Sequence, residues 1–204
     1  MNNLVLFRKN LRLLDNPALF KACDSGSILP VYIHDDKSSN RPLGGASKYW
    51  LHNALKSLNI SLNNKMVFKY GDYLNSLKEL IEKFSIDAVY LDKSYTPDEI
   101  KLDTKIESML FDLNVETKSF NCSLLWEPRI ILKPDESPYK VFTPFYKRGC
   151  LNSSVPSKPV GKPKQINFIK HNECSNLESL KLIDKYKWSS KLDSHWVITE
   201  QAAV

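Results

Sequence analysis

Short apolar runs alternate with longer stretches of helical spacing up to about residue 120, and this alternation constrains the fold more than any other feature. A short apolar run between polar or turn residues is typical of a buried strand, whereas apolar residues at i, i+3 and i+4 are typical of a helix. The runs predict five strands, at residues 4–7, 28–33, 66–68, 88–91 and 115–120. Because helical segments separate them, the predicted sheet is mostly parallel.

Helix start and stop signals support this division of the chain. Asn16 is a good N-cap, Pro17 suits the first helical position, and Gly26 follows as a stop signal. Further helices are predicted from about Gly45, from Asp72 and from Pro97.

The predicted fold is α/β: a Rossmann-like, doubly wound, five-stranded parallel sheet with helices on both faces, plus an extended C-terminal linker segment. After residue 120 the alternation ends. Residues 121–141 are Pro-rich and irregular, and a short helix is predicted from Pro144. Residues 152–165 contain three prolines, which is typical of an extended linker.

Composition excludes several classes of protein. Apolar residues make up 42% of the chain, enough for a globular core. No apolar run approaches the roughly 20 residues that span a bilayer, so no membrane partner is expected. The cysteines make no C-x-x-C pair and indicate reduced thiols in a cytoplasmic protein; they are Cys23, Cys122, Cys150 and Cys174.

The net charge of +6 is a weak argument for a nucleic-acid interface. Residues 151–170 contain four lysines and no acidic residue, so this one segment supplies four of the six charges. The basicity is therefore mostly a property of the linker.

A ligand site is expected at one edge of the sheet. In an open parallel sheet, ligands bind beyond the carboxyl ends of the strands, where the strand order reverses. With five strands, that point commonly lies between the first and fourth strands. The loops 8–15 and 92–99 should then face each other, with the loop 34–37 nearby, and we expect a ligand in this crevice.

Glu99 has a structural interpretation beside the functional one. Thr96 and Glu99 match a capping box, in which Thr96 is the N-cap and Glu99 reaches back to it. Acidic residues in a first helical turn are also favoured by the helix dipole. This interpretation is favoured, although a helix start at this edge is also where a polar ligand would meet the protein.

The arginines of the loop 8–15 have a structural alternative too. Arg8 and Arg12 are candidates for pairing with Asp15, with Asp35 or with a neighbouring segment. The sequence has no P-loop, no G-x-S-x-G and no metal-ligand spacing of histidines, so neither catalytic nor metal-binding residues are predicted.

Several motifs resemble, in order, those of the DNA photolyase and cryptochrome family. FRKNLRLLDNPAL, residues 7–19, is similar to the family's first motif, close to FRxDLRxxDNxAL, with Asn10 where that pattern usually has Asp. LGGASKYWLHNALKSLNISL (43–62), YTPDE (95–99) and YKVFTPFYKR (139–148) resemble later segments. The resemblance covers roughly residues 3–150, and several ordered matches are more specific than one.

The resemblance implies the antenna-binding domain of a light-dependent DNA-repair photolyase. In that family an antenna chromophore, here methenyltetrahydrofolate, deazaflavin or FMN, passes energy to FAD in a C-terminal helical domain, which repairs damaged DNA. A cryptochrome photosensor domain, and a stand-alone nucleotide-binding or interaction module of the same fold, stay open as alternatives.

The resemblance also suggests domain limits. Residues 1–150 are expected to form the antenna domain, and 151–204 a linker and the start of the FAD-binding helical domain. HWVITEQAAV, residues 195–204, resembles the family's W-x-x-G-E-x-x-A, with Thr199 in the place of the glycine. FAD binding and repair would need the rest of that helical domain.

Asp98 and Glu99 fall where folate-binding members carry an Asn–Glu pair that contacts the pterin. Asp98 lacks the amide donor, and an acid here also suits members with a deazaflavin antenna. The candidate chromophore-binding residues are Arg8, Lys9, Asn10, His34, Asp35, Asp98 and Glu99. The residues expected to meet the helical domain, or to favour self-association without it, are Tyr139, Val141, Phe142 and Phe145.

Overall fold

The computed structural model describes residues 1–36, 42–171, 176–183 and 195–203, and the chain divides into two compact units. Unit 1 is Met1–Cys122 with Val160–Val204, and unit 2 is Ser123–Pro159. The sequence predicted a different division, into an antenna domain at residues 1–150 and a linker with the start of a helical domain at 151–204. That division stays a prediction.

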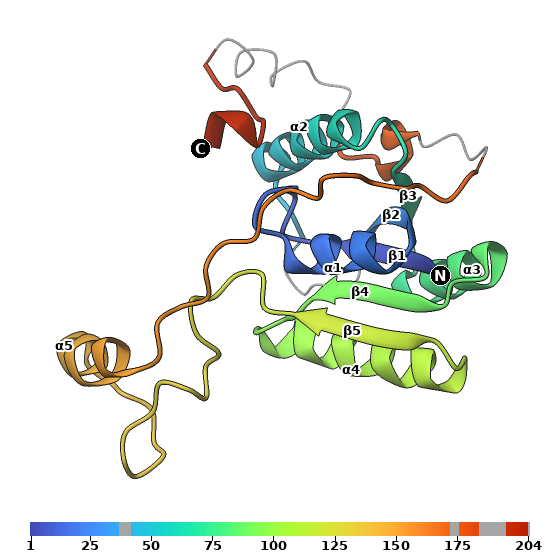
Figure 1. Ribbon diagram of the computed structural model, residues 1–204. Helices are drawn as coiled ribbons and strands as arrows, with labels where there is room; N and C mark the ends of the chain where they lie inside the picture. Colours follow the sequence, from blue (N-terminus) through green and yellow to red (C-terminus); the bar gives the residue numbers. More distant parts are fainter. Residues whose placement is uncertain (37–41, 172–175, 184–194, 204) are drawn as a thin grey trace. The chain divides into compact units, whose positions relative to one another are not determined.

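Unit 1 is built on a five-stranded parallel sheet, as predicted. Its strands are β1 (Asn2–Phe7), β2 (Ser27–His34), β3 (Val67–Tyr70), β4 (Ala88–Asp92) and β5 (Glu116–Phe120). Their order is β3-β2-β1-β4-β5 (Figure 1). The chain winds outward from β1 to β3, then returns to place β4 on the other side of β1. The strand order therefore reverses between β1 and β4, where the sequence predicted it.

Helices cover both faces of the sheet. The helices are α1 (Pro17–Ser25), α2 (Gly45–Ser61), α3 (Tyr73–Phe84) and α4 (Pro97–Asp112). Alternate residues of β1 enter two separate cores. Val5 and Phe7 pack in the cluster that contains residues of α1 and α2, whereas Leu4 and Leu6 pack in the cluster that contains residues of α3 and α4. A strand buried on both faces is what the continuous apolar run predicted.

The N-caps explain where two of the helices begin. The side chain of Asn16 accepts a hydrogen bond from Leu19 N at 3.1 Å and donates one to Arg12 O at 3.0 Å. Asp72 accepts from Asn75 N at 2.8 Å at the start of α3.

The capping box predicted at the start of α4 is wrong in its hydrogen bonding. Thr96 is the N-cap residue, but its side chain makes no cap hydrogen bond. Its hydroxyl instead donates to Glu99 Oε2 at 2.6 Å. Glu99 remains in the first turn, where the helix dipole favours an acid.

The predicted C-terminal linker returns to unit 1 and extends its sheet locally. Ile28 N donates to Asn167 O at 2.7 Å, and Ile169 N donates to Ile28 O at 2.9 Å. β3 pairs with β2 only from Val31 onward. Pro30, which has no N–H to donate, lies between these two pairings, and this accounts for a proline inside a central strand.

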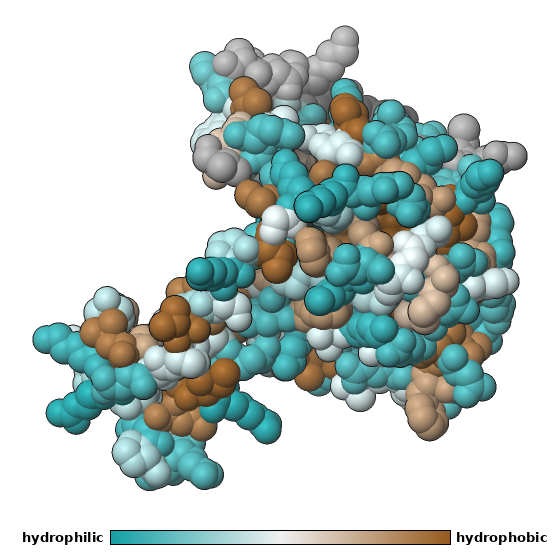
Figure 2. All heavy atoms as spheres, viewed as in Figure 1, coloured by the Kyte–Doolittle hydropathy of each residue, from teal (hydrophilic) through white to brown (hydrophobic). Residues whose placement is uncertain are grey.

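Unit 2 has little regular structure. A short helix, α5 (Phe142–Pro144), continues into the turns Phe145–Gly149 and Cys150–Asn152, close to where a helix was predicted. Gly149 packs so closely on Ile131 that a Cβ would lie 2.6 Å from its side chain, so a larger residue here would force a neighbour to shift. Figure 2 shows hydrophobic residues gathered at the surface of this unit, around the α5 of Figure 1.

The helices and the cysteines of the described residues bear on two further expectations from the sequence. None of its helices has the length and apolar character that a bilayer crossing requires. Cys23, Cys122 and Cys150 are free thiols, and Cys174 lies outside the described residues.

Replacing Asn16 by alanine should destabilise unit 1 by about 1–2 kcal/mol, because α1 loses its cap and Arg12 O loses a donor. Thr96→Ala is the matched control. It should cost less than about 0.5 kcal/mol, because the Thr96 side chain does not cap α4. Urea unfolding followed by far-ultraviolet circular dichroism measures both. Equal losses for the two variants would contradict the capping assignment.

Candidate ligand-binding site at the switch point of the sheet

A buried ion cluster joins the elements on either side of the switch point. Arg8 directly follows β1, and its Nε donates to Asp92 Oδ1 at the end of β4 at 3.1 Å. Its other nitrogens bond the Asp92 carbonyl and the carboxylate of Asp103 on α4. The side chains are 13%, 7% and 13% exposed, respectively. One guanidinium thus ties β1 to β4 and α4.

The charge state of this cluster follows from its surroundings. Burial alone would lower the pKa of Arg8, but the hydrogen bond that it donates to Asp103 and the nearby Tyr73 and Asp92 raise it above its ordinary value. Burial also raises the pKa of Tyr73, and Arg8 offsets this only in part. Both shifts favour the charged form of Arg8 and the neutral form of Tyr73.

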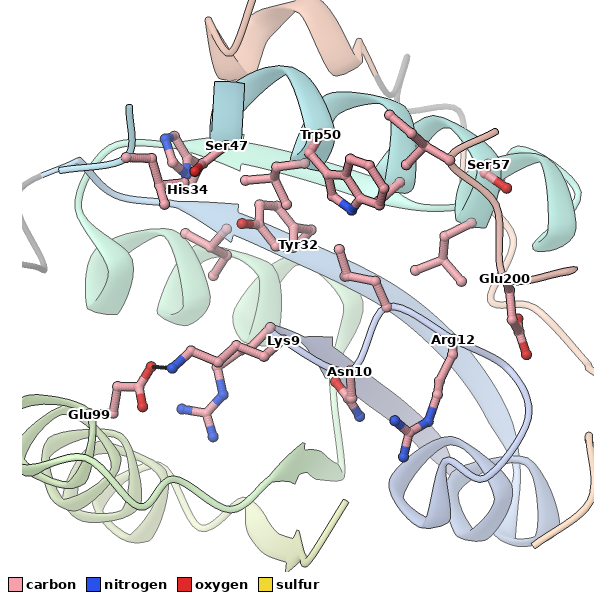
Figure 3. Close-up of a pocket in the computed structure, with 18 of the residues that line it drawn as sticks. Lys9, Asn10, Arg12, Tyr32, His34, Ser47, Trp50, Ser57, Glu99 and Glu200 are labelled. Atoms are coloured by element: carbon pink, nitrogen blue, oxygen red, sulfur yellow. Dashed lines mark ion pairs between the residues drawn. The ribbon is translucent and has the colours of Figure 1, made fainter. Parts of the chain in front are cut away.

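Lys9 and Glu99 form a second, more exposed link across the same point. Lys9 Nζ lies 2.6 Å from Glu99 Oε1 (Figure 3). Burial raises the pKa of Glu99, but the bonds to Lys9 and Thr96 outweigh it and hold the pKa below its ordinary value. Asp98 faces solvent and lies 3.8 Å from Lys101. Glu99 thus has a protein partner, and Asp98 lies at the exposed rim.

Arg12 and Asp15 fix the loop that follows β1. Arg12 donates to Asp15 O at 2.9 and 3.1 Å and to Cys122 O at 2.7 Å. Asp15 has a φ of 49°, and its backbone N donates to Val160 O at 2.9 Å. Arg12 therefore pairs with one of its expected partners, whereas Arg8 pairs with a neighbouring segment.

A cavity of about 1090 Å³ opens beside these contacts. Small-molecule sites commonly occupy about 300–1,000 Å³, so its size suits a ligand of several fused rings. Its walls come from the loop 8–15, the end of β2, α2, the start of α4 and residues 198–203. All seven residues that the sequence suggested for ligand binding line it: Arg8, Lys9, Asn10, His34, Asp35, Asp98 and Glu99. Their contact with a ligand stays a prediction.

One face of α2 forms the wall that sequence reasoning missed. Its lining residues recur at helical spacing: Ser47, Trp50, Leu51, Ala54, Ser57, Leu58 and Ser61. Trp50 is 47% exposed and points from α2 into the cavity, with Tyr32 of β2 nearby (Figure 3). The apolar spacing predicted the helix, but it did not distinguish the face that packs on the sheet from the face that lines a cavity.

Two buried polar atoms of the cavity-lining residues have no protein partner. These are Asn10 Oδ1 and the hydroxyl oxygen of Tyr73. Asn10 is 5% exposed and Tyr73 7% exposed. Such atoms are costly to bury without a hydrogen bond. The cavity beside them has apolar and aromatic walls, which suit a flat heterocyclic ligand.

A cluster of polar side chains lies at the far end of the cavity, where β2 ends. Asp36 accepts from the Tyr70 hydroxyl at 3.0 Å and lies 3.1 Å from His34 Nε2. Lys48 Nζ is 3.5 Å from the same carboxylate. Burial raises the pKa of Asp36, but Tyr70, His34 and Lys48 together lower it below its ordinary value. His34 is thus buried and oriented by a carboxylate, beside Asp35.

Comparison with known proteins connects this geometry to one family. The DNA photolyase family model matches residues 3–164. A deoxyribodipyrimidine photo-lyase of Agrobacterium fabrum is 33% identical over 98% of this chain and 43% of its own length. Cryptochrome-1 of Arabidopsis thaliana is 28% identical over 80% of this chain and 25% of its own length.

Solved structures that resemble this chain include members of the same family. A class III photolyase from Agrobacterium tumefaciens superposes with a TM-score of 0.86 and 34% identity, over 96% of this chain and 41% of that one. A Synechocystis cryptochrome superposes with a TM-score of 0.78 at 21% identity, over 91% of this chain and 41% of that one, and this shows a shared fold. This chain spans about two fifths of the length of the photolyases from Agrobacterium.

Replacing Arg8 by methionine should destabilise unit 1 by about 3–5 kcal/mol, because two buried carboxylates lose their counter-charge. The matched control is Lys9→Met. Its partner Glu99 is partly exposed, so the loss should stay below about 1 kcal/mol. Unfolding in urea compares the two variants with the wild type. A loss for Arg8→Met no larger than that for Lys9→Met would refute the role given to the buried cluster.

Proposed function

This chain belongs to the DNA photolyase family, and on that premise we propose that its cavity holds the antenna chromophore of a light-dependent DNA-repair protein. The observation that carries the proposal is the cavity at the switch point. It combines an aromatic wall, Trp50 and Tyr32, with a polar side formed by Lys9 and Glu99. A ligand of fused rings with a polar edge would match both features.

The chromophore would be held by residues of three elements. Trp50 offers a ring face from α2, and Asn10 lines the cavity from the loop that follows β1. Lys9 and Glu99 border the opposite side as an ion pair. When bound, such a group would supply the absorption of light and the transfer of its energy to FAD. The protein supplies the position, the exclusion of water and the polar surroundings.

Methenyltetrahydrofolate, deazaflavin and FMN are the proposed candidates for this chromophore. Asp98 lies exposed at the rim, and Glu99 is engaged by Lys9 and Thr96. The pair is therefore less free to bind a pterin than an Asn–Glu pair without these partners would be. Among the three candidates, this counts against methenyltetrahydrofolate.

The proposed partner is an FAD-binding helical domain, and through it damaged DNA. Unit 2 offers an apolar surface for such a partner: Val141 is 63% exposed and Phe142 73% exposed. The Phe142 and Tyr146 rings stack at 5.8 Å, and Tyr139 meets Phe145 edge-on at 6.2 Å. An exposed apolar surface of this kind is typical of an interaction site. The cytoplasmic location indicated by the cysteines belongs to the same proposal.

The chromophore proposal predicts that Trp50→Ala weakens ligand binding by about tenfold or more, because a stacked aromatic face commonly contributes about 1–3 kcal/mol. Methenyltetrahydrofolate, 8-hydroxydeazaflavin and FMN are added separately to the wild-type chain, and absorbance that co-elutes with the protein reports binding. Equilibrium titration then gives the dissociation constant of each bound compound.

Trp126→Ala is the control for this experiment, since Trp126 belongs to unit 2 and hydrogen-bonds Ser154 O at 2.7 Å within it. It should leave the dissociation constant unchanged. Binding of none of the three compounds to the wild type, alone or extended by the helical domain, would remove the antenna role.

The interface proposal predicts that the chain self-associates weakly through Val141 and Phe142 when no helical domain covers them. The double substitution Val141→Ser and Phe142→Ser should shift the molecule toward the monomer in sedimentation velocity. Phe111→Ser is the control, because Phe111 is 82% exposed but lies on α4 in unit 1, outside the surface of unit 2. A wild type that stays monomeric at every concentration would count against this use of the surface.

A further inference from the structure

Residues 195–203 return to unit 1 and lie at the cavity. The segment ends in the turn Gln201–Ala203, where Ala202 N donates to the Thr199 hydroxyl at 3.2 Å. Its cavity-lining residues are Ile198, Thr199, Glu200 and Ala203. This segment is about 180 residues from the loop 8–15 in sequence, yet the two form adjoining parts of one wall.

Glu200 joins the segment to that loop. Its Oε2 accepts from Leu13 N at 2.9 Å and its Oε1 from Leu14 N at 2.7 Å. The side chain is only 12% exposed, and Lys162 Nζ lies 3.9 Å from Oε1. One carboxylate thus binds two consecutive backbone amides, and hydrogen bonds to a charged acceptor are the stronger kind.

A second contact holds the segment against α2. The ring of Trp196 meets that of Trp50 edge-on, with 5.6 Å between the centroids. Trp50 itself lines the cavity. The segment therefore touches both walls that a bound ligand would touch, the loop through Glu200 and α2 through Trp196 (Figure 3 shows Glu200, Trp50 and Arg12 around the cavity).

We propose that Glu200 is a positioning residue: it fixes the loop 11–15 in the shape that forms the cavity wall, so that docking of residues 195–203 and ligand binding stabilise each other. The proposal rests on the proposed function insofar as the ligand is a chromophore in this cavity. Coupling of this kind is reciprocal, and values of about 5–150-fold in affinity are typical.

Contacts other than those of Glu200 also hold the loop 8–15. Arg12 binds Asp15 O and Cys122 O, and Asp15 exchanges hydrogen bonds with Val160. A variant at Glu200 should therefore keep the sheet and the start of α1 while losing only the local anchor. This separates a positioning role from a general contribution to stability.

The test compares Glu200→Ala and Glu200→Gln with Gln201→Ala, an exposed neighbour in the same turn. Hydrogen exchange at the Leu13 and Leu14 amides is measured first, without ligand. Glu200→Ala should accelerate exchange at both amides by about tenfold or more, since both lose a charged acceptor. Glu200→Gln keeps one carbonyl acceptor and should fall between, and Gln201→Ala should match the wild type.

Ligand binding is measured next with FMN, 8-hydroxydeazaflavin and methenyltetrahydrofolate. The compound that binds the wild type should bind Glu200→Ala at least about fivefold more weakly. At saturation it should slow exchange of the Leu13 and Leu14 amides in the wild type but much less in Glu200→Ala. Gln201→Ala should behave as the wild type in both measurements.

Unchanged exchange in Glu200→Ala overturns the anchor. Faster exchange with an unchanged dissociation constant overturns the coupling. If the wild type binds none of the three compounds, the proposed function and the coupling fail together, while the exchange rates without ligand still decide the anchor.

Discussion

The buried pairing of Arg8 with Asp92 and Asp103 is the interaction on which the rest of unit 1 depends. In an open parallel sheet, the strands on either side of the switch point have no connection that closes the gap beyond their carboxyl ends. Here one guanidinium closes it between β1 and β4. It also orients α4, because Asp103 lies on that helix.

Closing this gap determines where the cavity can open. The space directly between β1 and β4 is occupied by side chains that satisfy one another. The hollow therefore lies beside it, over β2 and against α2. This explains why the aromatic wall comes from Trp50, whereas the ionic wall comes from Lys9 and Glu99. A phosphate-binding turn would need glycines and free backbone amides here, and the loop has neither glycines nor free amides at Leu13 and Leu14.

The fold was largely predictable, because a parallel sheet buries both faces of its strands and leaves a plain apolar signal. Each of the five strands begins and ends within one or two residues of its predicted bounds. All seven candidate residues line one cavity because the loops that follow β1, β2 and β4 meet at the same edge. Trp50 was not identified as a cavity residue, since apolar spacing alone does not reveal which helix face meets the sheet. Tyr73 gave no signal either, because an unpartnered hydroxyl is defined only by its neighbours.

The sequence by itself determined the alternation of strands and helices, the point where the strand order reverses and membership in the family. Local apolar periodicity and ordered motifs are features of the sequence alone. Only the tertiary structure decided the partners of Arg8 and of Glu200. Arg8 forms an ion pair with Asp92, 84 positions away in the sequence. Glu200 accepts a hydrogen bond from the backbone amide of Leu13, 187 positions away. No local pattern encodes such a pair, since its free energy depends on burial and on geometry that exist only after the chain has folded.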